Sequence, residues 1–259
     1  MSNHVITTIG GFISKIRKKY SDWKSPQYVW FRGEPVVDTR LLPKLYRPKS
    51  DGSLHNENKL LQMFRMKAPS FASFPTPIRG NTDEWLFLAQ HVGLPTRLLD
   101  WTENAILALY FALKEEKPAV WMLNPMELNT HVVRTLSGQD VEPFDEFPLT
   151  WFHQEKSINI GNENIRGAWE HDKRGLELPV AVQPTYLHPR MSAQRSVFTI
   201  HGTKKLPLDM LVPSDLLAKF EIRPQARKSI TRDLAILGIQ EATIYPDLDG
   251  LAKELTLLY

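Results

Sequence analysis

The residues best suited to chemistry in this chain begin with an arginine that follows an aromatic segment. Arg32 comes after the aromatic and β-branched residues 28–31, which predict a short buried strand, and before Gly33, which would let the backbone turn. An arginine side chain stays charged and offers a planar fork of donors that matches phosphate oxygens in pairs. We therefore predict that Arg32 binds an anion. The alternative is an ion pair with Glu34 or Asp38 at the strand end.

A second group of polar residues lies between two apolar segments, in the run LAQHVGLPTRLLDWTENAILALYFAL of residues 88–113. Its candidate site residues are Gln90, His91, Arg97, Asp100 and Trp101. A buried arginine and a buried aspartate are costly unless they pair with each other or with a ligand. Two interpretations are open, an internal ion pair between Arg97 and Asp100 that fixes the turn, or a contact with a ligand.

Two helices are expected to hold this polar run in place. Asn81 and Glu84 have the spacing of a capping box at the start of the first helix, and Gly93 suits the left-handed residue that ends it. Thr102 can cap a second helix, in which apolar residues recur with helical period over 106–113. The polar elbow between the helices is thereby anchored on both sides.

A third polar group is predicted at the entrance of a later strand, Val197–His201. Gln194 precedes this strand, and Arg190 lies four residues earlier. A glutamine amide can hydrogen-bond a ribose hydroxyl or another amide, so both side chains are candidates for the same ligand. Alternatively, both satisfy backbone carbonyls in a bend.

The rest of the pattern predicts a single α+β domain with a central mixed or split sheet of about six short strands and surrounding helices. The strands are expected to begin near Tyr28, Ala119, Pro179, Val197, Lys219 and Ala242. Residues 1–27 are expected to contribute an amphipathic helix packed on the core, and further helices are predicted at 56–68 and 226–237. The weakly patterned segment 129–176 is interpreted as an insertion or a lid.

Composition narrows the classes of function. The chain has 259 residues, 42% hydrophobic and 24% charged, and no cysteine, which excludes disulfides and a cysteine nucleophile. No apolar run approaches the ~20 residues of a membrane span, and the N-terminus lacks a signal-peptide layout, so a cytoplasmic location is expected. The net charge of +3 is too small to indicate a nucleic-acid partner, and the basic clusters at 15–19 and 223–232 are interpreted as solvated helix faces. His153, Glu155 and His171 lack metal-ligand spacing, so no metal site is predicted.

Four motifs together resemble the FRG-domain family. They are Phe31-Arg32-Gly33, the run QHVGLPTRLLDWT of residues 90–102, the segment 194–201, and YPDLDGL at 245–251. The resemblance extends over residues 28–259. It implies a bacterial or phage-associated effector in a toxin or defence setting, with an antitoxin or other defence protein as a possible partner.

The aromatic-Arg-Gly strand end also resembles the first strand of the arginine class of ADP-ribosyltransferases, in which the arginine holds the phosphates of NAD. That class uses a serine-rich strand, of which residues 195–199 are a loose echo, and a catalytic glutamate. Glu241 is the nearest late glutamate and precedes a possible closing strand, although no Glu/Gln-x-Glu pair is present. The resemblance implies NAD as substrate and a protein or nucleic acid as acceptor.

Three hypotheses follow. In the first, the chain is an NAD-using enzyme of the ADP-ribosyltransferase or NAD glycohydrolase type. NAD would be bound by Arg32, Gly33, Gln90, His91, Arg97, Trp101, Tyr110 and Arg190, with Trp101 or Tyr110 stacking on a ring. Catalysis would involve Asp100, Gln194 and Glu241. In the second, the same site binds a nucleotide or phosphorylated ligand without turnover, and in the third, its arginines bind or cleave a nucleic acid.

Overall fold

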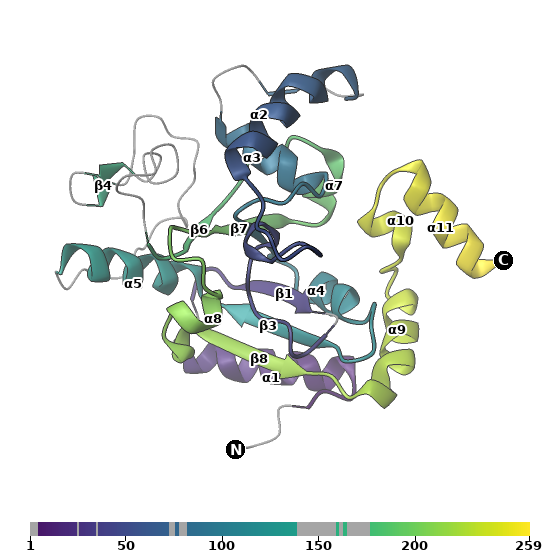
Figure 1. Ribbon diagram of the computed structural model, residues 1–259. Coiled ribbons are helices and arrows are strands. Elements are labelled where there is room, and N and C mark those ends of the chain that lie inside the picture. The colour runs from purple at the N-terminus through teal and green to yellow at the C-terminus, as the bar shows by residue number, and fades with distance from the viewer. Residues whose placement is uncertain are drawn as a thin grey trace.

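The structure is a computed structural model, and it describes residues 5–24, 26–34, 36–72, 76–77, 82–138, 159–160, 163–164 and 177–259. Within these ranges a six-stranded sheet has the order β6-β7-β2-β1-β3-β8, and neighbouring strands are antiparallel (Figure 1). The strands are β1 (Trp30–Glu34), β2 (Leu98–Thr102), β3 (Ala119–Leu123), β6 (Val180–Val182), β7 (Ser196–Ile200) and β8 (Leu217–Glu221). The predicted α+β class with a six-stranded core is confirmed.

Helices cover both faces of the sheet because successive strand residues point to opposite sides. Trp30 belongs to one apolar cluster, together with residues of α3 (Thr82–His91), α5 (Pro125–Ser137) and α8 (Leu208–Leu211). Phe31 belongs to the other, with residues of α1 (Ile9–Asp22), α4 (Ala105–Ala112) and α9 (Arg227–Ile236). The N-terminal helix packs on the core through Phe12.

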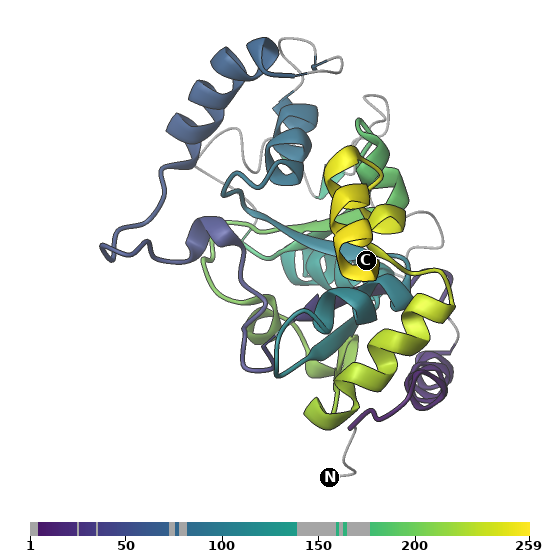
Figure 2. The ribbon, with the colours of Figure 1, turned by 90° about the vertical axis from the view of Figure 1, so that its right-hand side faces the viewer.

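Smaller elements complete the described chain. They are α2 (Glu57–Lys67), α7 (Pro189–Ala193), α10 (Glu241–Ile244), α11 (Leu248–Leu258), the hairpin β4 (Asn159–Ile160) and β5 (Glu163–Asn164), and the 3-10 turns η1 (Lys44–Tyr46), η2 (Ala68–Ser70), η3 (Ser214–Leu216) and η4 (Pro224–Ala226). Figure 2 shows α10 and α11 in yellow beside α7, and contacts join α10 to α7. The C-terminal part of the chain therefore lies beside α7, the helix that contains Arg190.

Gly33 does not end a strand, as the sequence suggested, but lies inside β1. A Cβ atom there would lie 2.1 Å from the backbone oxygen of Ala108 and 2.6 Å from the backbone nitrogen of Ala112. Only a residue without a side chain allows α4 to cross β1 at this distance. Gly33 therefore sets the position of α4 against the strand that carries Arg32.

The polar elbow contains a strand that sequence patterns did not reveal. Gly93 has a positive φ of 86° after α3, as predicted, but β2 follows and forms the centre of the sheet. The cap of α4 is Asn104, whose side chain accepts hydrogen bonds from Ile106 and Leu107, whereas the predicted cap Thr102 is a strand residue. The predicted capping residue Asn81 lies outside the described residues.

The end of the chain also differs from expectation. Residues 242–244 belong to α10 rather than to a closing strand, and β2 supplies the sixth strand instead. Asp247 caps α11, accepting a hydrogen bond of 2.7 Å from Gly250 N. The beginning of the proposed insertion, residues 129–137, belongs to α5, and most of the remainder lies outside the described residues.

Candidate functional site

Three adjoining cavities lie where the polar groups meet. The basic cavity, of about 500 Å³, is lined by Arg32, Lys44, Arg47 and His55 with Gln90, Gly93 and Asp100. The aromatic cavity, of about 390 Å³, shares Arg32, Gln90, Gly93 and Asp100 with the basic cavity and adds Phe31, Phe111 and Phe198. The outer cavity, of about 380 Å³, shares Lys114 and Arg190 with the aromatic cavity. These volumes fall within the roughly 300–1,000 Å³ of small-molecule sites.

Arg32 stands at the boundary of the basic and aromatic cavities. Its Nε donates to Glu34 Oε1 at 2.5 Å, and its Nη1 donates to the backbone oxygen of Asp100 at 2.7 Å. The side chain is 17% exposed, and no described residue accepts a hydrogen bond from Nη2. Burial alone would lower the pKa of Arg32, but the charges of Glu34 and Asp100 outweigh it and raise the pKa. The predicted alternative, an ion pair with Glu34, is thus present, and it leaves part of the guanidinium available.

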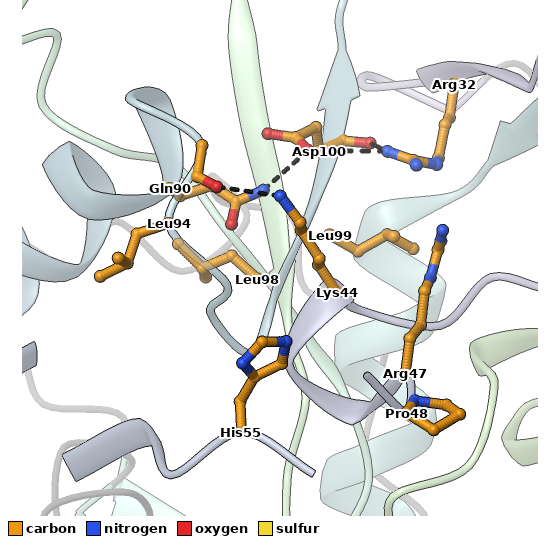
Figure 3. Close-up of a pocket in the computed structure, with 11 residues that line it drawn as sticks. Arg32, Lys44, Arg47, Pro48, His55, Gln90, Leu94, Leu98, Leu99 and Asp100 are labelled. Atoms are coloured by element: carbon orange, nitrogen blue, oxygen red, sulfur yellow. Dashed lines mark hydrogen bonds and ion pairs between the residues drawn. The ribbon is translucent and has the colours of Figure 1, made fainter. Parts of the chain in front are cut away.

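A second arginine faces Arg32 in the basic cavity. Figure 3 shows the ends of the Arg32 and Arg47 side chains directed toward each other. The Nε of Arg47 donates to the Leu42 oxygen at 3.0 Å, and no described residue bonds its terminal nitrogens. Burial and the positive charge of Arg32 lower the pKa of Arg47, against the opposing effect of Glu34. Two like charges are therefore held together in a hollow.

Lys44 adds another positive charge to the basic cavity, with its Nζ donating to the Gly93 oxygen at 3.2 Å. Sequence analysis did not select Lys44 or Arg47, because residues 36–48 have no periodic pattern that predicts a helix or a strand. The signal that could have found them is the basic run PKLYRP directly after the Arg32 strand. The turn η1 directs this run toward Arg32.

Two consecutive hydrogen bonds, through Gln90 of α3, hold the Asp100 carboxylate in place. Thr96 Oγ1 donates to Gln90 Oε1 at 2.5 Å, and Gln90 Nε2 donates to Asp100 Oδ2 at 2.7 Å. The Asp100 side chain is 57% exposed, and Arg32 Nη1 lies 3.8 Å from Oδ2. Among the described lining residues of the basic and aromatic cavities, Asp100 is the one carboxylate.

The proposed ion pair between Arg97 and Asp100 is wrong. Arg97 instead forms a two-pronged pair with Glu57 on α2, in which Nε lies 2.9 Å from each carboxylate oxygen. Arg97 precedes β2 by one residue and Asp100 lies within it, so alternation along the strand sends the two side chains to opposite faces. Arg97 therefore does not line any of the three cavities.

Neither ring predicted to stack on a ligand is well placed for it. Trp101 is 3% exposed, and its indole nitrogen donates to Thr199 Oγ1 at 3.1 Å, so its ring belongs to the core. Tyr110 does not line any of the three cavities, and its hydroxyl accepts a hydrogen bond of 2.5 Å from Lys114 Nζ. Of the phenylalanines that line the aromatic cavity, Phe31 and Phe198 are also core residues, 6% and 2% exposed, whereas Phe111 is half-buried.

The polar end of the aromatic cavity contains His91, Gln194, Ser196 and Arg190. The ring of His91 lies 4.6 Å from that of His188, and burial, followed by His188 and Arg190, lowers the pKa of His91 to about 4. His91 is therefore neutral at physiological pH. Gln194 donates to the Ile244 oxygen at 3.3 Å, which joins the cavity wall to α10.

Glu241 does not reach the aromatic cavity. Its carboxylate is paired with Lys114 and lines the outer cavity, and its side chain is 12% exposed. Burial would raise the pKa of Glu241, but hydrogen bonds from Lys114 and Tyr110 lower it. The predicted catalytic position on a closing strand is absent from the described chain, because Glu241 begins α10.

Most of the predicted site residues nevertheless meet. Eight of them line the aromatic cavity, namely Arg32, Gly33, Gln90, His91, Asp100, Trp101, Arg190 and Gln194. Within the described ranges, no group of three His, Asp or Glu residues could hold a metal ion. Over those same ranges, no helix is long and apolar enough to cross a membrane.

Comparison with known proteins identifies part of this region. Residues 27–120 match the family model of the FRG domain. Searches among curated proteins and among solved structures found no match. The matched residues run from the start of β1 into β3, and they include Arg32, Arg47, Gln90 and Asp100. Residues 27–120 therefore match the FRG domain, and this segment supplies all lining residues of the basic cavity.

Proposed function

We propose that this protein binds a nucleotide by its phosphates, between Arg32 and Arg47. The observation that carries the proposal is the pair of guanidinium groups directed toward each other. No described residue bonds Nη2 of Arg32 or either terminal nitrogen of Arg47. Like charges held in a hollow repel each other, and an anion between them converts this repulsion into two charge-assisted interactions. Lys44 adds a third cation to the same wall.

The neighbouring cavity suits the rest of such a ligand. It combines aromatic side chains with polar groups at Gln194, Ser196 and His91, which is the usual composition of a small-molecule site. A phosphate at Arg32 can be continuous with a sugar and base in the aromatic cavity, because Arg32 lines both hollows. A basic cavity that adjoins an aromatic one therefore favours a nucleotide over a free inorganic anion.

The second candidate function is cleavage of NAD, with or without transfer of ADP-ribose to an acceptor. The observation that favours it is Asp100, a half-exposed carboxylate at the boundary of the two cavities and next to Arg32. There it can stabilise the positive charge that develops on the ribose as nicotinamide leaves. The family resemblance adds a toxin or defence setting. Glu241 contributes to this candidate only indirectly, because Lys114 engages its carboxylate.

Calorimetric titration with ADP and NAD tests the first proposal. We expect Arg47→Gln and Arg32→Lys to weaken binding about tenfold or more, since each removes a charge-assisted contact or the arginine fork. Arg32→Lys retains a charge beside the buried Glu34, which keeps the variant folded. The control is Arg232→Ala, which removes an exposed arginine of α9 that lines none of the three cavities. Equal affinities in all four proteins would reject the proposal.

Release of nicotinamide separates the two candidates. NAD glycohydrolase or transferase activity predicts turnover that Asp100→Asn lowers by at least about tenfold, as for loss of an electrostatic contact in a transition state. Saturable binding of NAD without nicotinamide release would leave the binding proposal standing and reject the enzymatic one.

A further inference from the structure

Arg190 is a second arginine of the site that lacks a counterion among the described residues. It lies in α7, lines both the aromatic and the outer cavity, and no described carboxylate forms an ion pair with it. Its Nε is buried without a hydrogen-bond partner. Arg190 as a whole is half-buried and also hydrogen-bonds Tyr245. A buried donor left without an acceptor is nevertheless costly, and this favours an anionic ligand at Arg190.

The packing around Arg190 holds its guanidinium in place. The carbon at the centre of this group lies 4.4 Å from the centre of the Tyr245 ring, a cation–π arrangement that orients the fork. Tyr245 follows α10 directly, so the C-terminal segment supplies the platform. A guanidinium fixed on a ring loses little conformational freedom when it binds a ligand.

The three described carboxylates that line the outer cavity with Arg190 either bind other groups or are exposed to solvent. Glu241 is paired with Lys114, and Asp247 accepts the hydrogen bond that caps α11. Asp249 also lines the outer cavity and is exposed, and Lys253 lies over the other part of the same platform at 5.9 Å from the Tyr245 ring centre. Because Glu241 neutralises Lys114, Arg190 is the cation at the junction of the aromatic and outer cavities that no described carboxylate pairs.

The aromatic cavity thus has an arginine at each of its two junctions. Arg32 stands where it meets the basic cavity, and Arg190 stands where it meets the outer cavity. We propose that Arg190 is a second anion anchor, and that the ligand is a nucleotide with phosphates at two separate positions of its sugar. One phosphate lies at Arg32 and Arg47, the nucleoside fills the aromatic cavity, and the other phosphate lies at Arg190. This inference rests on the proposed nucleotide binding and specifies the class of nucleotide.

The test compares ligands that carry the same number of phosphates in different places. ADP has both phosphates at the 5′ position, whereas adenosine 3′,5′-bisphosphate has one at each of two positions. We expect the full chain to bind the bisphosphate about tenfold more tightly than ADP in calorimetric titration, the size of one charge-assisted contact. Arg190→Gln should abolish this preference, and Arg190→Lys should retain part of it.

Lys253→Gln is the matched control, because it removes a charge from the outer cavity at a residue that does not line the aromatic one. It should retain the preference for the bisphosphate, which distinguishes a direct contact from a general change in charge. Thermal unfolding of each variant confirms that it is folded before its affinity is interpreted.

The outcomes separate the two proposals. If ADP binding depends on Arg47 but the bisphosphate binds no more tightly, or if Arg190→Gln retains the preference, the second anchor is refuted and the nucleotide site stands. If neither ligand binds, or binding is unaffected by Arg47→Gln, the nucleotide site itself is refuted and the second anchor with it.

Discussion

Arg32 lies in β1 and Arg97 directly precedes the neighbouring strand β2, and the two arginines are held in different ways. Arg97 is fastened to both oxygens of Glu57, with side chains that are 15% and 12% exposed. Arg32 gives one nitrogen to Glu34 and another to a backbone oxygen, and it faces Arg47 across a cavity. An arginine whose guanidinium pairs with a carboxylate on a neighbouring helix stabilises the folded protein. An arginine directed at another arginine is arranged for a ligand.

The largest effect should come from disturbing the strand that carries Arg32. Gly33→Ala places a Cβ 2.1 Å from the Ala108 oxygen, and backbone atoms cannot give way as a flexible side chain would. We expect a loss of at least about 3 kcal/mol in the free energy of unfolding, measured in urea, and loss of nucleotide binding. Gly10→Ala is the control, because nothing lies within 4 Å of its added Cβ. Equal unfolding midpoints for the two variants would contradict the close packing of α4 on β1.

The next largest effect should come from breaking the structural arginine pair. Arg97→Gln leaves the carboxylate of Glu57 partly buried without its counterion, which should cost about 3 kcal/mol of unfolding free energy. Nucleotide affinity in the protein that remains folded should be unchanged, because Arg97 lines none of the three cavities. Loss of affinity without loss of stability would reverse the roles assigned to the two arginines.

Lowering the pH should reduce the free energy of unfolding through protonation of His201, which is near both Arg32 and Arg97. Burial, and then the charges of Arg32 and Arg97, lower the pKa of His201 to about 3, from 6.5 in the unfolded chain. The unfolded chain therefore binds the proton more readily, so the contribution of His201 is complete above pH 6.5 and is lost as the pH falls from 6.5 toward 3. Between pH 7 and pH 5 this amounts to about 2 kcal/mol. Urea unfolding at both values should show a smaller decrease in His201→Phe than in His131→Gln, and equal decreases would count against this assignment.

The smallest change in stability, and the most informative one, is expected at Arg47. Arg47→Gln removes a charge that Arg32 repels, so the free energy of unfolding should change by less than about 0.5 kcal/mol or rise slightly. Phosphate-dependent binding should nevertheless weaken about tenfold. Arg97→Gln should instead lose stability and retain affinity, so measuring both variants together tests the different roles of the two arginines. A marked loss of stability in Arg47→Gln would show that Arg47 serves the fold.

Sequence patterns identified the elements whose signals are local. The strand expected near Ala119 begins at that residue, and the helix predicted at 56–68 is present as α2, with Asn56 as its cap. The missed strand β2 has no alternation of apolar and polar residues, because successive residues such as Leu98 and Leu99, which point to opposite faces, are both buried. Its identity is determined by pairing with β1 and β7, which lie far away in the sequence.

The same distinction applies to the site. Arg32, Arg190 and Gln194 could be named from their positions beside predicted strands, and Gln90 and Asp100 from the polar run between two apolar segments. The structure brings these five residues together. The partners of the arginines could not be named from the sequence. Arg97 pairs with Glu57, which lies forty positions earlier. Arg47, which faces Arg32, follows the turn η1, and this turn has no periodic pattern. Glu241 was selected by its place in the sequence, and the helix that it begins turns it toward Lys114.

The order of the sheet limits how far this domain can be trimmed. The segment that matches the FRG model ends at residue 120, whereas β7 lies against β2 and β8 lies against β3. A fragment excised at that boundary would leave the hydrogen-bonding edges of both β2 and β3 bare, and such edges promote aggregation. Expression of the matched segment alone should therefore yield insoluble protein, and any minimal unit must extend at least through β8.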